Sequence, residues 1–157
     1  MTAPASLRER LGLPPSARIL MAAGDYAAHD GMRMAVWAFD VLKYAAPDLH
    51  LVLVGDGPGR ERVERFARSL GPDDYRVHFL TDDSPASVVQ EADVIWGTHP
   101  SGGMNFLRAA LAVGKPAIAM RTPDTEGLAG ALLTPAGDPV ALATATRKSL
   151  DVLVGCR

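Results

Sequence analysis

The stretch ADVIWGTHPSGGMNFLRAALAVGKPAIAM, residues 92–120, is typical of a strand, a loop, a helix and a second strand. Asp93–Trp96 is a short, mostly apolar run that suits a buried parallel strand. The apolar residues of Met104–Val113 predict a helix, which Gly114 ends because glycine readily adopts a left-handed conformation. Pro116–Met120 is then the next strand. A β–loop–α–β unit of this kind predicts a parallel sheet.

The loop between the first strand and the helix is a candidate anion site. Gly102 and Gly103 allow its backbone to come close to a ligand. The first N–H groups of the helix, which follows Ser101 and starts near Met104, have no helical partners and point outward. A phosphate group is therefore one expectation at this glycine pair. The alternative is a helix start that simply needs small residues.

Length and composition indicate one ordinary globular domain. The 157 residues, of which 48% are hydrophobic and 22% charged, are enough to bury about two-thirds of the unfolded surface. The net charge of -2 gives no electrostatic reason to expect nucleic acid. The single cysteine, Cys156, excludes an intramolecular disulfide and fits a reducing compartment. No apolar run approaches the roughly 20 residues that span a bilayer, so we expect a cytoplasmic protein, either free or peripheral to the membrane.

The rest of the chain alternates strands and helices. Further strands are expected at Arg18–Ala23, His50–Val54 and Tyr75–Leu80, and a short one within Leu128–Thr134. A short helix that ends near Gly12 is expected within Ala3–Leu13. Further helices are expected at Met32–Ala45, Val63–Leu70, Ser84–Glu91 and Pro139–Val154. This order predicts an α/β fold, a Rossmann-like parallel sheet of about six strands with helices on both faces. No linker or repeat divides residues 1–157, so a single domain is expected.

Four loops are expected to meet at the carboxyl edge of this sheet, where such folds bind ligands. They are residues 24–31, residues 55–59, the segment after Leu80, and residues 97–103. Gly55, Gly57 and Gly59 have the wrong spacing for a dinucleotide fingerprint, which favours glycines of a tight turn.

Histidines in this sequence give only weak signals of chemistry. His29 and His99, with aspartates nearby, leave a metal site conceivable, but solvated loop residues are the preferred interpretation and no metal is expected. His50 and His78 fall in strands and are interpreted as structural. Ser101 has no Gly-x-Ser-x-Gly elbow around it, which disfavours a hydrolase nucleophile.

Seven segments of the chain occur in a familiar order and spacing. They are LGLP (11–14), a strand ending at Gly24, PDLHLVLVGDGP (47–58), VHFL (77–80), ADV (92–94), AVGKP (112–116) and LTPAGD (133–138). As an ordered series they resemble group 1 glycosyltransferases. More specifically, they resemble the C-terminal, donor-binding half of a retaining enzyme with the two-domain GT-B architecture. The resemblance covers nearly the whole chain.

The resemblance implies a nucleotide-diphosphate-sugar donor, bound in the cleft between two Rossmann-like halves. The base would be held through the backbone near Leu80 and Thr81. The diphosphate would bind at Ser101, Gly102, Gly103 and Met104. Gly24, which follows the first strand, is also expected to belong to this site. The nucleotide-sugar is a substrate, so no cofactor is expected. The implied partner is an acceptor-binding N-terminal domain, which is missing from these residues.

Four positions depart from the family pattern. The two glutamates that contact the transferred sugar and the ribose correspond here to Ser101 and Ala109. The Arg and Lys aimed at the diphosphate correspond to Asp25 and Asp30. Losing one positively charged contact to the diphosphate typically lowers the rate on the order of 10²–10³-fold. Replacing the cation by a carboxylate should lower the rate further, because a carboxylate repels a diphosphate. Arg108 lies about 100° around the helix from Ala109 and is not expected to replace the lost charges.

These departures leave three hypotheses about function. The first is a donor-binding domain of a glycosyltransferase, with a divergent site, no catalytic residue of its own and no activity in isolation. The second is a non-catalytic GT-B-like interaction or scaffold domain that has lost donor binding. The third is another GT-B-type enzyme, such as a sugar-nucleotide epimerase, for which no residue gives a positive sign.

Overall fold

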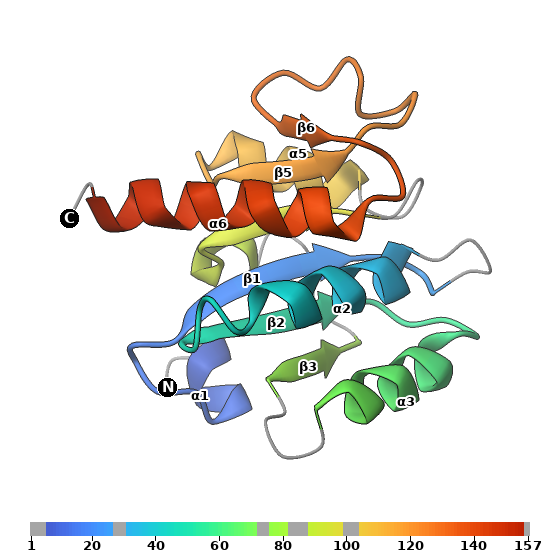
Figure 1. Cartoon of the computed structure of the whole chain (residues 1–157), viewed down its shortest axis with the longest axis vertical. Helices are drawn as coiled ribbons and strands as arrows, with labels where there is room; N and C mark the ends of the chain where they lie inside the picture. The colour runs from blue at the N-terminus through green and yellow to red at the C-terminus, as the bar shows by residue number, and fades with distance from the viewer. Residues whose placement is uncertain (1–5, 27–30, 72–75, 82–87, 99–103, 156–157) are drawn as a thin grey trace, which may run out of the picture.

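The computed structural model describes residues 6–26, 31–71, 76–81, 88–98 and 104–155. In this part of the chain, six parallel strands form one sheet in the order β3-β2-β1-β4-β5-β6 (Figure 1). The strands are β1 (Arg18–Ala23), β2 (Leu49–Val54), β3 (Val77–Leu80), β4 (Val94–Gly97), β5 (Ala117–Met120) and β6 (Leu132–Thr134). The sheet confirms the expected α/β, Rossmann-like fold class.

Helices cover both faces of the sheet. One face carries α2 (Gly31–Leu42), α3 (Arg60–Leu70) and α6 (Pro139–Gly155). The other carries α1 (Leu7–Leu11), the 3-10 helix η1 (Val89–Glu91) and α5 (Met104–Ala112). No helix within the described residues is both long and apolar enough to cross a bilayer.

Strand β1 contributes to the cores on both faces of the sheet. Leu20 and Ala22 pack with residues of α2, α3 and α6, whereas Ile19 and Met21 pack with residues of α1, η1 and α5. All four side chains are at most 1% exposed. This explains why the strand is a continuous apolar run, since a strand covered on both faces has no side that favours polar residues.

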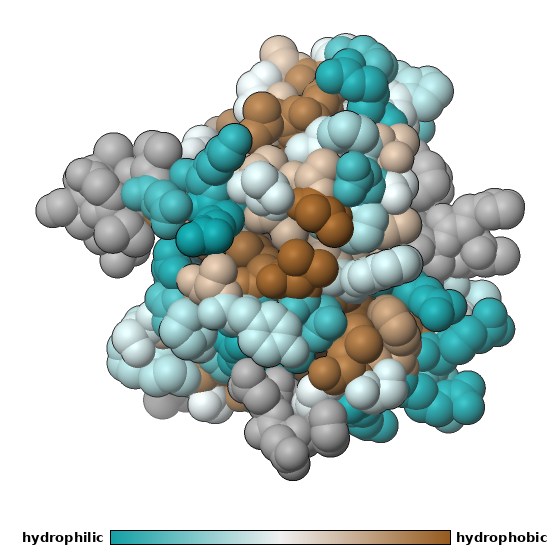
Figure 2. Space-filling model, viewed as in Figure 1, coloured by the Kyte–Doolittle hydropathy of each residue, from teal (hydrophilic) through white to brown (hydrophobic). Residues whose placement is uncertain are grey.

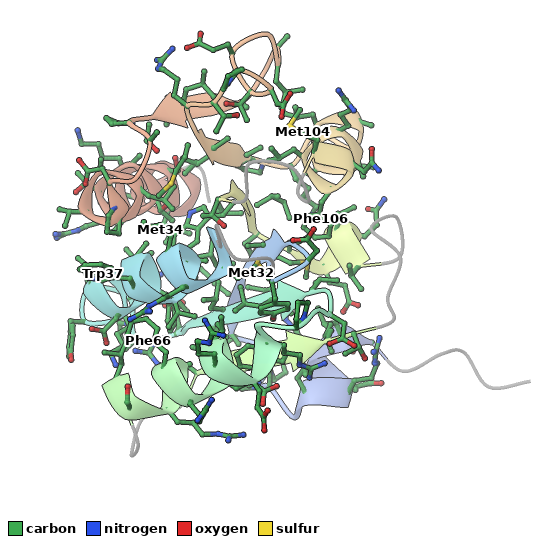
Figure 3. The ribbon with its side chains drawn as sticks, turned by 90° about the vertical axis from the view of Figure 1, so that its right-hand side faces the viewer. Met32, Met34, Trp37, Phe66, Met104 and Phe106 are labelled. Carbon is green, nitrogen blue, oxygen red and sulfur yellow. The ribbon has the colours of Figure 1, made fainter. Side chains whose placement is uncertain are left out.

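The strand order reverses between β1 and β4, which are paired with each other. From β1 the chain adds β2 and then β3 on one side, and it later adds β4, β5 and β6 on the other. In open parallel sheets the crevice at such a reversal, outside the carboxyl ends of the strands, is where ligands bind. These ends lie on the right in Figure 1 and face the viewer in Figure 3.

The structure confirms some predicted ends of elements and changes others. The first helix ends at Leu11, next to Gly12 as predicted, because Gly12 turns left-handed at a φ of 67°. Helix α2 ends at Leu42 rather than Ala45, and the chain then turns. β6 is the short strand expected within Leu128–Thr134, and it starts after Gly130, whose φ of 93° interrupts extended backbone. The described end of the predicted helix Ser84–Glu91 is the 3-10 turn η1, and residues 84–87 lie outside the described part.

Two buried side chains join elements by hydrogen bonds. The indole Nε1 of Trp96 in β4 donates to Oγ1 of Thr146 in α6 at 2.7 Å. The guanidinium of Arg76, just before β3, donates to four carbonyl oxygens between α2 and β2, at distances from 2.8 to 3.0 Å. Because Arg76 is only 8% exposed, these bonds satisfy carbonyls that water does not reach.

Candidate functional site

The candidate site is the carboxyl edge of the sheet, where the loops after β1, β2, β3 and β4 begin. The backbone N–H of Gly24 donates to the carbonyl of Val54 at 3.1 Å, and that of Gly55 to the carbonyl of Leu80 at 2.8 Å. The strand ladder therefore continues one residue past the strands and brings Gly24, Leu80 and Thr81 to one edge. Figure 3 faces this edge and labels Met104, the first residue of α5.

The loops after β1 and β2 lie in direct backbone contact. A Cβ placed on Gly55 would lie 1.9 Å from the carbonyl oxygen of Gly24, and one on Gly57 would lie 1.7 Å from that of Asp25. One on Gly59 would lie 2.5 Å from the carbonyl oxygen of the next residue, Tyr26. Gly55 also has a φ of 140°. The three glycines, predicted to make a tight turn, thus also let one loop lie flush against the other.

Tyr26 is held in an unusual conformation in the first of these loops. Its φ is 54°, in the left-handed region that non-glycine residues seldom adopt, and its side chain is only 1% exposed. Its carbonyl accepts a hydrogen bond from the N–H of Gly59 at 3.1 Å, and its ring lies 6.5 Å from that of Phe79 in β3. Such strain persists only where surrounding contacts fix it, so the backbone after Gly24 is firmly positioned. No pattern in the sequence predicted a role for Tyr26.

Carboxylates outnumber cations in the described loops. Asp25 and Asp56 are both exposed, and the described loop residues 24–26, 55–59, 81 and 98 include no Lys or Arg. The adjacent cation is Arg60, the first residue of α3, which the sequence analysis also missed. Its Nε lies 2.8 Å from the carboxylate of Glu64 and its Nη1 lies 3.9 Å from that of Asp56. Its positive charge is thus already offset by neighbours.

Helix α5 lies close to the sheet because β4 ends in glycine. A Cβ on Gly97 would lie 2.6 Å from Cδ1 of Leu107 in α5 and 3.0 Å from Cβ of Ala119 in β5. The helix begins at Met104, the predicted residue, and its first turn contains no acidic side chain. Its first amides are thus near β4, at the reversal of strand order. Ser101, Gly102 and Gly103 lie outside the described residues, and their role stays a prediction.

Residues in and near α5 lack the acidic side chain that the family pattern has at this helix. Ala109, at the position of the expected glutamate, is half-buried against the core, and Arg108 beside it is exposed. Thr98, which follows β4, is 6% exposed, and its hydroxyl has no hydrogen-bond partner among the described residues. Thr98 was not predicted from the sequence, since a single threonine in a polar loop carries no distinctive pattern.

The histidines do not assemble at this edge in the described part of the chain. His50 and His78 contact each other, with Nδ1 and Nε2 3.1 Å apart, within β2 and β3. Burial, and secondarily the charge of His50, lowers the pKa of His78 to about 4. No three His, Cys, Asp or Glu side chains among the described residues are placed to hold a metal ion, and His29, Asp30 and His99 lie outside that part.

Comparisons with known proteins identify relatives over nearly the whole chain. The chain is 31% identical to a lipopolysaccharide core biosynthesis glycosyltransferase of Rhizobium meliloti over 157 residues, which covers 95% of this chain and 44% of the relative. It is 32% identical to the 2-deoxystreptamine glucosyltransferase of Streptomyces kanamyceticus over 154 residues, which covers 92% of this chain and 40% of the relative. The chain therefore spans less than half the length of either relative.

Solved structures share the fold. A glycosyltransferase from Rickettsia africae superposes with a TM-score of 0.77 at 17% identity, over 93% of this chain and 41% of that one. The catalytic domain of cholesterol-alpha-glucosyltransferase from Helicobacter pylori gives a TM-score of 0.70 at 19% identity, over 86% of this chain and 87% of that one. A family model described as glycosyl transferases group 1 matches residues 17–151. The chain belongs to the group 1 glycosyltransferases.

Proposed function

We propose that this chain is the donor-binding domain of a glycosyltransferase and holds a nucleotide-diphosphate-sugar at the carboxyl edge of its sheet. The observation that carries the proposal is the start of α5 at Met104, next to the strand-order reversal, in a member of this family. The unpaired amides at the start of a helix attract a phosphate without needing a particular side chain. The base would contact the backbone near Leu80 and Thr81, at the end of β3, which β2 and β1 separate from β4.

The side chains of this edge suit a divergent donor site. Asp25 is exposed where the family has a cation, and Ala109 has no group that can bond to a ribose hydroxyl. We therefore expect donor binding to depend mainly on the backbone and to be weak. The acceptor would bind to a second domain of a longer protein, and the isolated chain is expected not to transfer sugar. The sugar transfer itself needs positive charge opposite the leaving diphosphate.

The alternative is a non-catalytic interaction or scaffold domain that has lost donor binding. The exposed carboxylates of Asp25 and Asp56 favour it, as does the engagement of Arg60 by Glu64 and Asp56. In this case the sheet edge would repel a diphosphate, and the helix start would serve the fold alone.

Titration calorimetry with UDP, GDP and ADP distinguishes these functions. Donor recognition predicts binding of one nucleotide, weakened on the order of tenfold or more by Gly103→Glu, because the new carboxylate lies where the diphosphate would bind. The matched control is Gly127→Glu, since Gly127 lies in an exposed loop with nothing within 4 Å of a new Cβ. No heat with any of the three nucleotides at millimolar concentration would contradict donor recognition and favour the scaffold.

A further inference from the structure

Helix α2 and the turn that follows it carry an exposed apolar ridge, formed by Trp37, Val41 and Tyr44. These side chains are 52%, 41% and 78% exposed. Trp37 and Val41, four residues apart, lie on one side of α2, and Tyr44 follows in the turn. Figure 3 shows Trp37 on the outer side of α2, away from the sheet, whereas Met34 lies toward α6. The opposite side of the helix is buried in the core.

Further exposed apolar side chains lie on α6 and at the edge of the sheet. Val140 in α6 and Leu132 in β6 are 55% and 52% exposed. A pocket of about 740 Å³ lies between α6 and β6, and Pro116, Leu132 and Ala145 are among its lining residues. Figure 2 shows several separate hydrophobic patches on this face of the molecule, with more hydrophilic residues between them. Single exposed apolar side chains are ordinary, but a gathered set marks a surface that binds a partner.

The helices of this face are rich in cations, although the whole chain has a net charge of -2. α2, α3 and α6 together contain seven Arg or Lys and four Asp or Glu. Arg33, Arg62 and Arg147 are exposed, one on each helix. The guanidinium of Arg33 lies 4.6 Å from the ring centroid of Phe66, which connects α2 to α3 beside the ridge.

Two of the four carboxylates on these helices are in ion pairs. Asp40 lies 2.9 Å from the ammonium of Lys43, and Glu64 lies 2.8 Å from the guanidinium of Arg60. Asp151 in α6 is exposed. Glu61 is the remaining acidic residue of these three helices and is exposed. Cations therefore prevail around the ridge.

We propose that this face docks on an anionic lipid bilayer, with Trp37, Val41 and Tyr44 inserted at the headgroup level. Trp and Tyr favour this depth because each has an apolar ring and a polar group. An apolar helix side bordered by arginines is the pattern of helices that lie in a membrane interface, and the arginines are attracted to anionic lipids. The inference does not rest on nucleotide binding, because the ridge lies on a helix face and not at the carboxyl edge.

Vesicle sedimentation of the whole chain tests the ridge. We expect binding to phosphatidylcholine vesicles that contain phosphatidylglycerol and much weaker binding to phosphatidylcholine alone. The variant Trp37→Ser, Val41→Ser, Tyr44→Ser should bind at least about tenfold more weakly, because it removes the inserted groups. Val113→Ser is the matched control, since Val113 is 43% exposed and follows α5 on the other face.

Charge reversal tests the electrostatic part. Arg33→Glu should weaken binding to the anionic vesicles by about fivefold or more, whereas Arg108→Glu, at an exposed position on α5, should change it little. Fluorescence gives an independent signal, because Trp96 is only 1% exposed and a blue shift on adding vesicles would report Trp37.

Three results would overturn the proposal. The first is no binding to the anionic vesicles, or equal binding to both kinds. The second is binding that the serine variant leaves unchanged. The third is a concentration-dependent dimer that the serine variant abolishes, which would assign the face to a second copy of the chain. All substituted side chains are exposed, and circular dichroism would verify that each variant is folded.

Discussion

At the scale of single residues, Gly57 illustrates how closely the first two loops of the candidate site are packed. A Cβ there would lie 1.7 Å from the carbonyl oxygen of Asp25, and the backbone of one loop would have to move. The same contact positions Asp25 and Tyr26, the last described residues of the loop after β1. Small changes in this loop pair should therefore affect both stability and the shape of the carboxyl edge.

Gly57→Ala is expected to lower the free energy of unfolding by about 3 kcal/mol, because the added methyl group overpacks rigid backbone. Urea unfolding, followed by circular dichroism, measures the change. In Gly127→Ala the added Cβ has nothing within 4 Å, so that control should stay within about 0.5 kcal/mol of the unsubstituted chain. Equal midpoints for Gly57→Ala and the unsubstituted chain would mean that the two loops are not in contact.

His78 should make the stability of the chain depend on pH. Burial, and then His50, lowers the pKa of His78 from 6.5 to about 4 in the folded state. Between these values the unfolded chain binds more protons, so the stability due to this histidine is present above about 6.5 and declines as the pH falls toward 4. Because the ring is partly solvated, we expect a loss on the order of 1–2 kcal/mol.

The test compares urea unfolding of the chain and of His78→Gln at about pH 7 and about pH 5, on either side of the ordinary histidine value. Carboxylates titrate in both proteins, so the difference between them isolates His78. The chain should lose more stability on acidification than His78→Gln does. An equal loss in both proteins would show that the pKa of His78 is not lowered.

At the scale of elements, Arg76 connects the end of α2 to the sheet. Its guanidinium donates to carbonyls of Lys43, Ala46, Pro47 and Leu49. Arg76→Met should lower the free energy of unfolding by about 3 kcal/mol, since buried carbonyls lose charged donors. The matched control Arg68→Met, at an exposed position of α3, should change it by less than about 0.5 kcal/mol. Similar effects of the two substitutions would contradict this role of Arg76.

The elements also show how far the sequence predicts this structure. β1 was predicted with its observed ends, Arg18–Ala23, because an apolar run between turn residues is a local signal. The start of α5 at Met104 was predicted for a similar reason. The predicted end of α2, Ala45, was wrong. The helix ends at Leu42 because the turns that follow depend on Arg76, which is remote in sequence. Boundaries that tertiary contacts decide are not visible in a local pattern.

The candidate site was predictable only in part, for the same reason. The edge itself follows from strand order, and Gly24, Leu80 and Thr81 lie there as expected. The contact between the loops after β1 and β2 needs two segments that are adjacent only in the folded chain, so the conformation of Tyr26 had no sequence signal. The role of Gly102 and Gly103 stays a prediction.

At the scale of the whole molecule, the chain corresponds to less than half of its relatives from Rhizobium meliloti and Streptomyces kanamyceticus. In the proposed function the carboxyl edge of the sheet forms one wall of a donor cleft. A second domain would form the other wall and bind the acceptor. The proposed membrane face lies on α2, α3 and α6, on one face of the sheet, so both surfaces can act in one protein.

The central claim is that backbone amides at the start of α5 bind the diphosphate of a nucleotide. Amide chemical shifts of the ¹⁵N-labelled chain, followed by NMR during titration with UDP, GDP and ADP, test it most directly. With one of these nucleotides, the amides of Gly102, Gly103 and Met104 should shift together with those of Leu80 and Thr81, while Gly127 and Gly137 stay unchanged. Shifts confined to other parts of the chain, or none at millimolar nucleotide, would contradict the claim.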